Sequence, residues 1–172
     1  VLADVPQRKQ QGALSADALA ALHNALRQEV NDFTQLCDRA HLRRDHMLVV
    51  RYTLCTAIDE QISAQNWVAG GGNPHQPSAW SQHSLAHEFH QEAEGGNTVF
   101  LLLGRLAKEP QEHKHVLEII YQVLSLGYVG VYGIEANGHR TLEQIRHRLY
   151  ELIMTGVPPL DAQLSPRWRG IS

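Results

Sequence analysis

The central stretch of the chain, Leu42 to Trp67, reads LRRDHMLVVRYTLCTAIDEQISAQNW. Its apolar residues recur every three or four positions, at Leu48, Tyr52, Cys55, Ile58 and Ile62. That spacing is typical of an α-helix with one buried face. Gly and Pro residues gather directly after the stretch, in a loop from Gly70 to Ser78 that we expect at the surface. The stretch therefore predicts a long helix at the centre of the domain.

The same periodicity predicts a helix before this stretch. Ser15 has the character of an N-cap, and Asp17 follows in the first turn, where the helix dipole favours an anion. Apolar residues then recur at helical spacing, at Leu19, Leu22, Leu26, Val30, Phe33 and Leu36.

Four further helices are predicted after the loop. The third helix of the chain covers Ser81 to Ala93 and is stopped by Gly95 and Gly96. A fourth runs from Asn97 or Thr98 to Leu106, and a fifth has Pro110 in its first turn and closes at Gly127. The last begins with a capping box of Thr141 and Gln144 and continues through Ile153. The apolar segment from Tyr128 to Tyr132 is either a brief strand or a buried connector.

The composition fits one all-α domain of six to seven helices, since 43% of the 172 residues are hydrophobic. We expect a flexible segment over residues 1–12, the helical domain over 13–157 and a separate tail over 158–172. The net charge is −3 with no basic stripe, which argues against nucleic acid as a partner. Cys37 and Cys55 favour a reducing compartment, although a bridge between them stays open. A membrane span needs ~20 apolar residues, and we find no such run in the sequence.

The most tempting metal site is the histidine-rich third helix, where His83, His87 and His90 share one face and Glu92 lies nearby. The alternative function from this pattern is a small metal-dependent hydrolase. The HExxH motif fails, however, because Gln91 stands where its second histidine would be. Neither a GxSxG elbow nor a phosphate-binding glycine loop occurs. We therefore expect no metal, no cofactor, no small-molecule substrate and no catalytic residues.

The adjacent carboxylates Asp59 and Glu60 are the second candidate site. Asp59 lies on the apolar side of its helix, whereas Glu60 points roughly 100° away from it. Neighbouring residues on a helix diverge, so the pair is a poor acid–base dyad, and structural or binding roles are favoured. We expect Asp59 to be hydrogen-bonded inside the domain and Glu60 to be exposed.

Several phrases, taken together and in order, resemble the TssL/DotU/IcmH family of secretion-system membrane anchors between about Arg43 and Gly170. They are RYTLCTAIDE at Arg51 to Glu60, FHQEAEGG at Phe89 to Gly96, LSLGY at Leu124 to Tyr128, and the tail LSPRWRG at Leu164 to Gly170. The chain departs from the family pattern at Gly133, where a basic residue is expected.

The resemblance implies two small helical bundles meeting at a cleft, with Asp59, Glu60, His90 and Glu92 as cleft or partner-binding residues. It also implies a non-enzymatic role in a type VI or related type IVb secretion system. The expected partners are an IcmF-like inner-membrane protein and baseplate proteins, with a homodimer at the membrane. The domain would then be cytoplasmic, and one transmembrane helix would follow Ser172. The cluster Arg167, Trp168 and Arg169 fits such a juxtamembrane tail.

Overall fold

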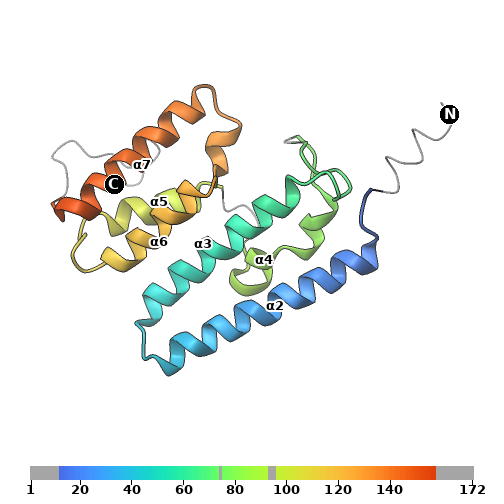
Figure 1. Ribbon diagram of the computed structural model, residues 1–172, viewed down its shortest axis with the longest axis horizontal. Helices are drawn as coiled ribbons and strands as arrows, with labels where there is room; N and C mark the ends of the chain where they lie inside the picture. The colour runs from blue at the N-terminus through green and yellow to red at the C-terminus, as the bar shows by residue number, and fades with distance from the viewer. Residues whose placement is uncertain (1–11, 74, 93–95, 158–172) are drawn as a thin grey trace.

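The computed structural model describes residues 12–73, 75–92 and 96–157 (Figure 1). These residues form six α-helices and two short 3₁₀ helices, and they contain no strand. In chain order the elements are α2 (Ala16–Arg39), α3 (Arg44–Ser63), η1 (Ala79–His83), α4 (Leu85–His90), α5 (Thr98–Leu106), α6 (Lys114–Ser125), η2 (Gly130–Gly133) and α7 (Gly138–Thr155). The all-α prediction is therefore confirmed. The predicted terminal segments, apart from Gly12, lie outside the described residues.

The helices pack in two groups that share α3, as Figure 1 shows. The first group joins α2, η1 and α4 to one side of α3. The second joins α5 and α6 to another side, with α7 packed on α6 and η2. Each group has its own cluster of buried side chains. The first cluster includes Leu19, Val30, Cys55, Ile62, Trp80 and Leu85. The second includes Val50, Tyr52, Phe100, Leu103, Leu117, Ile120, Ile145 and Leu149.

The first two helices follow their sequence signals closely. The Ser15 hydroxyl accepts a hydrogen bond from the Ala18 backbone N–H at 3.2 Å, which caps α2 as expected. The central helix α3 is shorter than predicted, because it ends at Ser63 and not near Trp67. Cys37 and Cys55 are buried and free, so they form no bridge.

The predicted third helix is wrong as a single element. The backbone at Ser84 turns to φ −55° and ψ 122°, which separates η1 from α4. The Ser84 hydroxyl then caps α4 by accepting from the His87 N–H at 3.1 Å. Gln91 adopts a left-handed conformation with φ 54°, so α4 ends at His90, well before the glycines that were expected to stop it.

The fourth predicted helix is confirmed, because α5 begins at Thr98 and ends at Leu106. The last two helices begin elsewhere than the sequence predicts. Pro110 lies in the turn before α6, which starts at Lys114. The last helix α7 begins at Gly138, and the Thr141 hydroxyl donates to the Asn137 carbonyl at 3.4 Å instead of capping. Gly138 is required there, since a Cβ would lie 1.8 Å from the Tyr132 carbonyl oxygen.

The segment from Tyr128 to Tyr132 is the buried connector of the two alternatives. Both tyrosines are buried, and the 3₁₀ helix η2 lies within and after the segment. Both rings pack against Phe100, with Tyr128 stacked at a centroid distance of 6.0 Å and Tyr132 edge-on at 4.7 Å. This connector brings backbone N–H groups next to α3, where they matter for the site.

One segment of the described residues, Lys114–Gly133, is long and apolar enough to cross a membrane. This differs from the expectation that no such run exists. The segment contains α6, whose residues Val116, Leu117, Ile120, Val123 and Leu124 are buried against the other helices. The core helix of a packed domain passes the same test, so the segment is weak evidence for a span.

Candidate functional site

The carboxylate of Asp59 fastens η1 and α4 to the central helix. Its Oδ1 accepts hydrogen bonds from the Trp80 indole N–H at 2.8 Å and the Leu85 backbone N–H at 3.0 Å. Its Oδ2 accepts from the Ser84 hydroxyl at 2.9 Å and the Ala86 backbone N–H at 3.0 Å. Four donors therefore surround one carboxylate. This arrangement suits a structural anchor better than a catalytic base, because all four donors are already committed to the carboxylate.

The carboxylate of Glu60 makes a similar attachment on a different face of α3. It accepts from the backbone N–H of Val129 at 3.0 Å and of Gly130 at 2.7 Å. Its side chain is therefore half-buried, which corrects the expectation that Glu60 is exposed. Burial raises the pKa of the Glu60 carboxyl, and the two N–H donors act in the opposite direction. One residue thus ties the second helix group to α3.

Gly130 makes the contact with Glu60 possible. Its φ of +53° lies in the left-handed region, and a Cβ there would lie 2.5 Å from the Gly96 carbonyl oxygen. The same Gly96 oxygen accepts a hydrogen bond from the Val131 N–H at 2.9 Å. Residues 96 and 130 thus bring two connecting segments into direct backbone contact beside α3.

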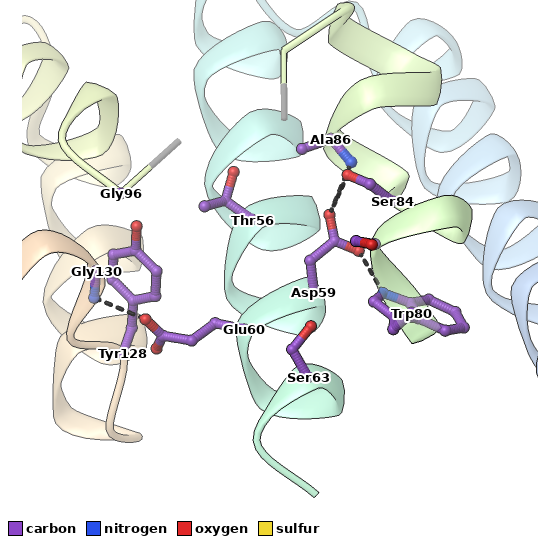
Figure 2. Close-up of a pocket in the computed structure, with 11 residues that line it drawn as sticks. Thr56, Asp59, Glu60, Ser63, Trp80, Ser84, Ala86, Gly96, Tyr128 and Gly130 are labelled. Atoms are coloured by element: carbon purple, nitrogen blue, oxygen red, sulfur yellow. Dashed lines mark hydrogen bonds between the residues drawn. The ribbon is translucent and has the colours of Figure 1, made fainter. Parts of the chain in front are cut away.

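A pocket of about 280 Å³ lies between these two attachments. Figure 2 shows Asp59 and Glu60 diverging from α3 toward opposite walls, with Tyr128 on the Glu60 side and Trp80 on the Asp59 side. Thr56 also belongs to this lining, and its hydroxyl is buried. Burial raises the pKa of the Tyr128 phenol, and the nearby Glu60 carboxylate adds to the effect. The pocket is therefore walled by polar groups that stay in fixed positions.

His90 lies at the end of α4 and does not line the pocket. Its Nε2 accepts a hydrogen bond from the Arg51 Nε–H at 3.1 Å, and its ring packs edge-on against Tyr52 at 5.3 Å. Burial and, to a smaller extent, the Arg51 charge together lower the pKa of His90 to about 4. The Arg51 guanidinium also lies 5.4 Å from the centre of the Phe89 ring. His90 is thus a neutral packing residue between α3 and α4.

Glu92 also lies apart from the pocket lining, where its carboxylate accepts from the Thr98 hydroxyl at 3.0 Å. Of the four candidate residues, the structure brings Asp59 and Glu60 to one pocket and places His90 and Glu92 elsewhere.

The three histidines of the suggested metal site do not converge. The His83 carbonyl contacts the His23 ring nitrogen at 2.7 Å, whereas the His87 side chain is exposed and His90 binds Arg51. The break at Ser84 separates His83 from the other two. The arrangement therefore gives no support to the hydrolase alternative.

Sequence reasoning missed the residues that complete the pocket, namely Thr56, Ser63, Trp80, Ser81, Ser84, Ala86, Gly96, Tyr128 and Gly130. Gly96 and Tyr128 were noticed only as a helix stop and part of a connector, because the convergence of these residues depends on how the two groups dock on α3. The Gly-Tyr-Val-Gly run at Gly127 to Gly130 was the available signal, because a left-handed glycine beside a buried tyrosine suits a close backbone approach.

Comparisons with known proteins agree with this architecture. A family model described as "Type VI secretion system protein DotU" matches residues 1–172. Among solved structures, the crystal structure of TssL from Vibrio cholerae is similar, with a TM-score of 0.68 and 26% sequence identity. The match covers 86% of this chain and 95% of that chain. No curated protein sequence matches the chain.

Proposed function

The chain belongs to the DotU family of type VI secretion system proteins, and from this premise we propose that its helical domain is a cytoplasmic docking module of the inner-membrane complex. Membership makes the chain a structural component of the secretion machine, which fits a protein without enzymatic activity. We propose further that it binds an IcmF-like membrane protein, recruits baseplate proteins and forms a homodimer at the membrane.

The observation that carries the docking proposal is the pocket between the Asp59 and Glu60 attachments. A docking surface needs a fixed shape and polar groups that can orient a partner. Both carboxylates are held by hydrogen bonds within the domain, so the pocket walls are preorganised.

A second part of the proposed docking surface is the loop between α3 and η1. Its residues His75, Gln76 and Pro77 are exposed, whereas Ser78 is buried and its hydroxyl donates to the Ser63 hydroxyl at 3.1 Å. Deleting the loop would therefore also remove a structural contact. A cleaner probe replaces His75 and Gln76 with aspartate and leaves Ser78 in place.

Charge reversal at Glu60 is equally unsuitable as a test of docking, because it removes two hydrogen bonds that hold the second helix group. Ser81→Arg is more selective, since Ser81 is exposed and lines the pocket, and its hydroxyl makes a single local hydrogen bond, to the Ser78 carbonyl at 2.8 Å. Gln82→Arg is the matched control, because Gln82 is the exposed neighbour outside the pocket lining.

The test measures binding of the purified chain to baseplate proteins and to the IcmF-like protein by interferometry. We expect Ser81→Arg to weaken binding of at least one partner about tenfold or more, a loss of ~1.4 kcal/mol, while Gln82→Arg binds normally. Circular dichroism spectra should be unchanged for both variants, and the melting temperature of Ser81→Arg should fall only by the loss of its local hydrogen bond to Ser78. Equal binding by Ser81→Arg and by the wild type would exclude the pocket as the docking surface.

The membrane location is tested separately by fractionation of the full-length protein. We expect it in the inner-membrane fraction, with this domain accessible from the cytoplasmic side. Recovery of the full-length protein entirely in the soluble fraction would contradict the anchoring role while leaving the docking role testable.

A further inference from the structure

A cluster of metal-binding side chains lies at the start of α6, away from the pocket. The carboxylates of Glu109 and Glu112 and the imidazole of His113 place three donor atoms within 4.8 Å of one another. In the part of the chain that the structure describes, this is the one such group of three. It comes from the turn that links α5 to α6 and is separate from the histidines considered above.

The distances within the cluster are those of ligands around an ion. His113 Nε2 lies 3.8 Å from Glu109 Oε2, too far for a hydrogen bond. Two ligands bound to one ion at ~2.0–2.2 Å each are separated by roughly 3–4 Å. Small rotations of the exposed glutamates would bring all three donors to binding distance.

His113 is held in an orientation that suits a ligand. Its side chain is only 12% exposed, and its Nδ1 lies 2.9 Å from Nε2 of His46 on α3. A histidine that binds a metal through one nitrogen almost always has a hydrogen-bond partner at the other. His46 is in the place of that partner, which leaves Nε2 of His113 facing Glu109.

The surrounding charges also favour a cation. Glu112 accepts from Arg43 Nη1 at 2.7 Å through Oε1, and Arg43 is shared with Asp45 at 2.7 Å. The single Arg43 guanidinium therefore forms ion pairs with two carboxylates, and a third carboxylate, that of Glu109, lies beside Glu112. A divalent ion would offset the remaining negative charge.

We propose that Glu109, Glu112 and His113 bind a divalent transition-metal ion, with His46 as the positioning residue that orients His113. A mixed set of carboxylates and imidazole suits Zn²⁺ or similar ions of the first transition row. The ion would fix the turn before α6 and, through His46, tie that turn to the first residues of α3.

The experiment uses untagged full-length protein that has been treated with a chelator and then titrated with Zn²⁺ by calorimetry. We expect one equivalent to bind saturably and to raise the melting temperature by about 5 °C or more at a hundredfold excess over the dissociation constant. Glu109→Gln should weaken binding at least tenfold and, at the same Zn²⁺ concentration, reduce the shift to about half or less. The Glu109 side chain is 67% exposed, so this variant keeps the packing intact.

The control is Glu151→Gln on α7. Glu151 lies 3.2 Å from His147 in an exposed pair with the same four-residue spacing as Glu109 and His113. This variant should bind Zn²⁺ as the wild type does, and His46→Gln should bind ~10–100-fold more weakly. Unsaturable binding, or binding that Glu109→Gln leaves unchanged, would mean scattered histidines hold the ion and would overturn the proposal.

Discussion

Replacing Asp59 with alanine should be one of the most destabilising single changes in the domain. The carboxylate accepts four hydrogen bonds, and two of its donors belong to residues that are almost completely buried. Trp80 is 1% exposed and Leu85 is 0% exposed. A buried donor without a partner costs ~1–3 kcal/mol. The pocket admits water to some of these groups, so we expect a total loss of about 3–5 kcal/mol.

Asp59→Asn separates lost hydrogen bonds from lost volume. The amide retains one acceptor oxygen but turns an NH₂ group toward two of the four donors. We therefore expect an intermediate loss of ~2 kcal/mol. Asp32→Ala is the control, because Asp32 is exposed on α2 and should change stability by less than ~0.5 kcal/mol.

The assay is urea unfolding followed by circular dichroism, with hydrogen exchange at the Leu85 and Ala86 amides as the local readout. We expect a lower midpoint with little change in slope, and faster exchange at both amides. A midpoint for Asp59→Ala within error of the Asp32→Ala midpoint would refute the anchoring role of Asp59. Unchanged exchange at these amides would refute the hydrogen-bond assignment itself.

Three further predictions concern the other side of α3 and the end of α4. Glu60→Gln should cost ~1–2 kcal/mol in urea unfolding, because one backbone N–H loses its acceptor; equal midpoints would contradict this. Gly130→Ala should cost ~2–4 kcal/mol, since the left-handed φ and the 2.5 Å approach to the Gly96 oxygen both oppose a Cβ; a normal melting temperature would disprove it. Because the His90 pKa is lower in the folded domain, His90 takes up a proton more readily in the unfolded chain. The free energy of unfolding should therefore be highest above pH ~6.5 and should fall as the pH drops toward 4. Because solvent screens part of this effect, His90→Gln should reduce the acid-induced loss of unfolding free energy by only ~1–2 kcal/mol. Parallel plots of unfolding free energy against pH for the wild type and the variant would contradict this prediction.

The sequence predicted best the elements whose signals are local. The Ser15 cap and the apolar stripe after it lie within one helix, and they locate α2 correctly. The sequence also indicated that Asp59 and Glu60 diverge, because this follows from helical geometry alone.

The errors arose where a distant contact overrides a local preference. The third helix breaks at Ser84 because Asp59, 25 residues earlier in the chain, accepts hydrogen bonds from the residues that follow the break. The sequence around Thr141 matches a capping box, but α7 starts one turn earlier, at Gly138. The helix can start there because a glycine fits against the Tyr132 backbone. Glu60 looked exposed on an isolated helix and is half-buried because the η2 connector docks on it.

The two attachments on α3 belong to consecutive residues, and this has a consequence for how such a domain can vary over evolution. Successive residues on a helix are ~100° apart. The angle between the two helix groups around α3 therefore depends on the peptide unit that joins Asp59 to Glu60. Many side chains in either group can change without altering that angle. An insertion or deletion of one residue between Val50 and Asp59 would instead rotate both carboxylates relative to the upstream half of the helix, and no local repacking could restore both attachments. The tolerance of α3 to substitution should therefore greatly exceed its tolerance to changes in length.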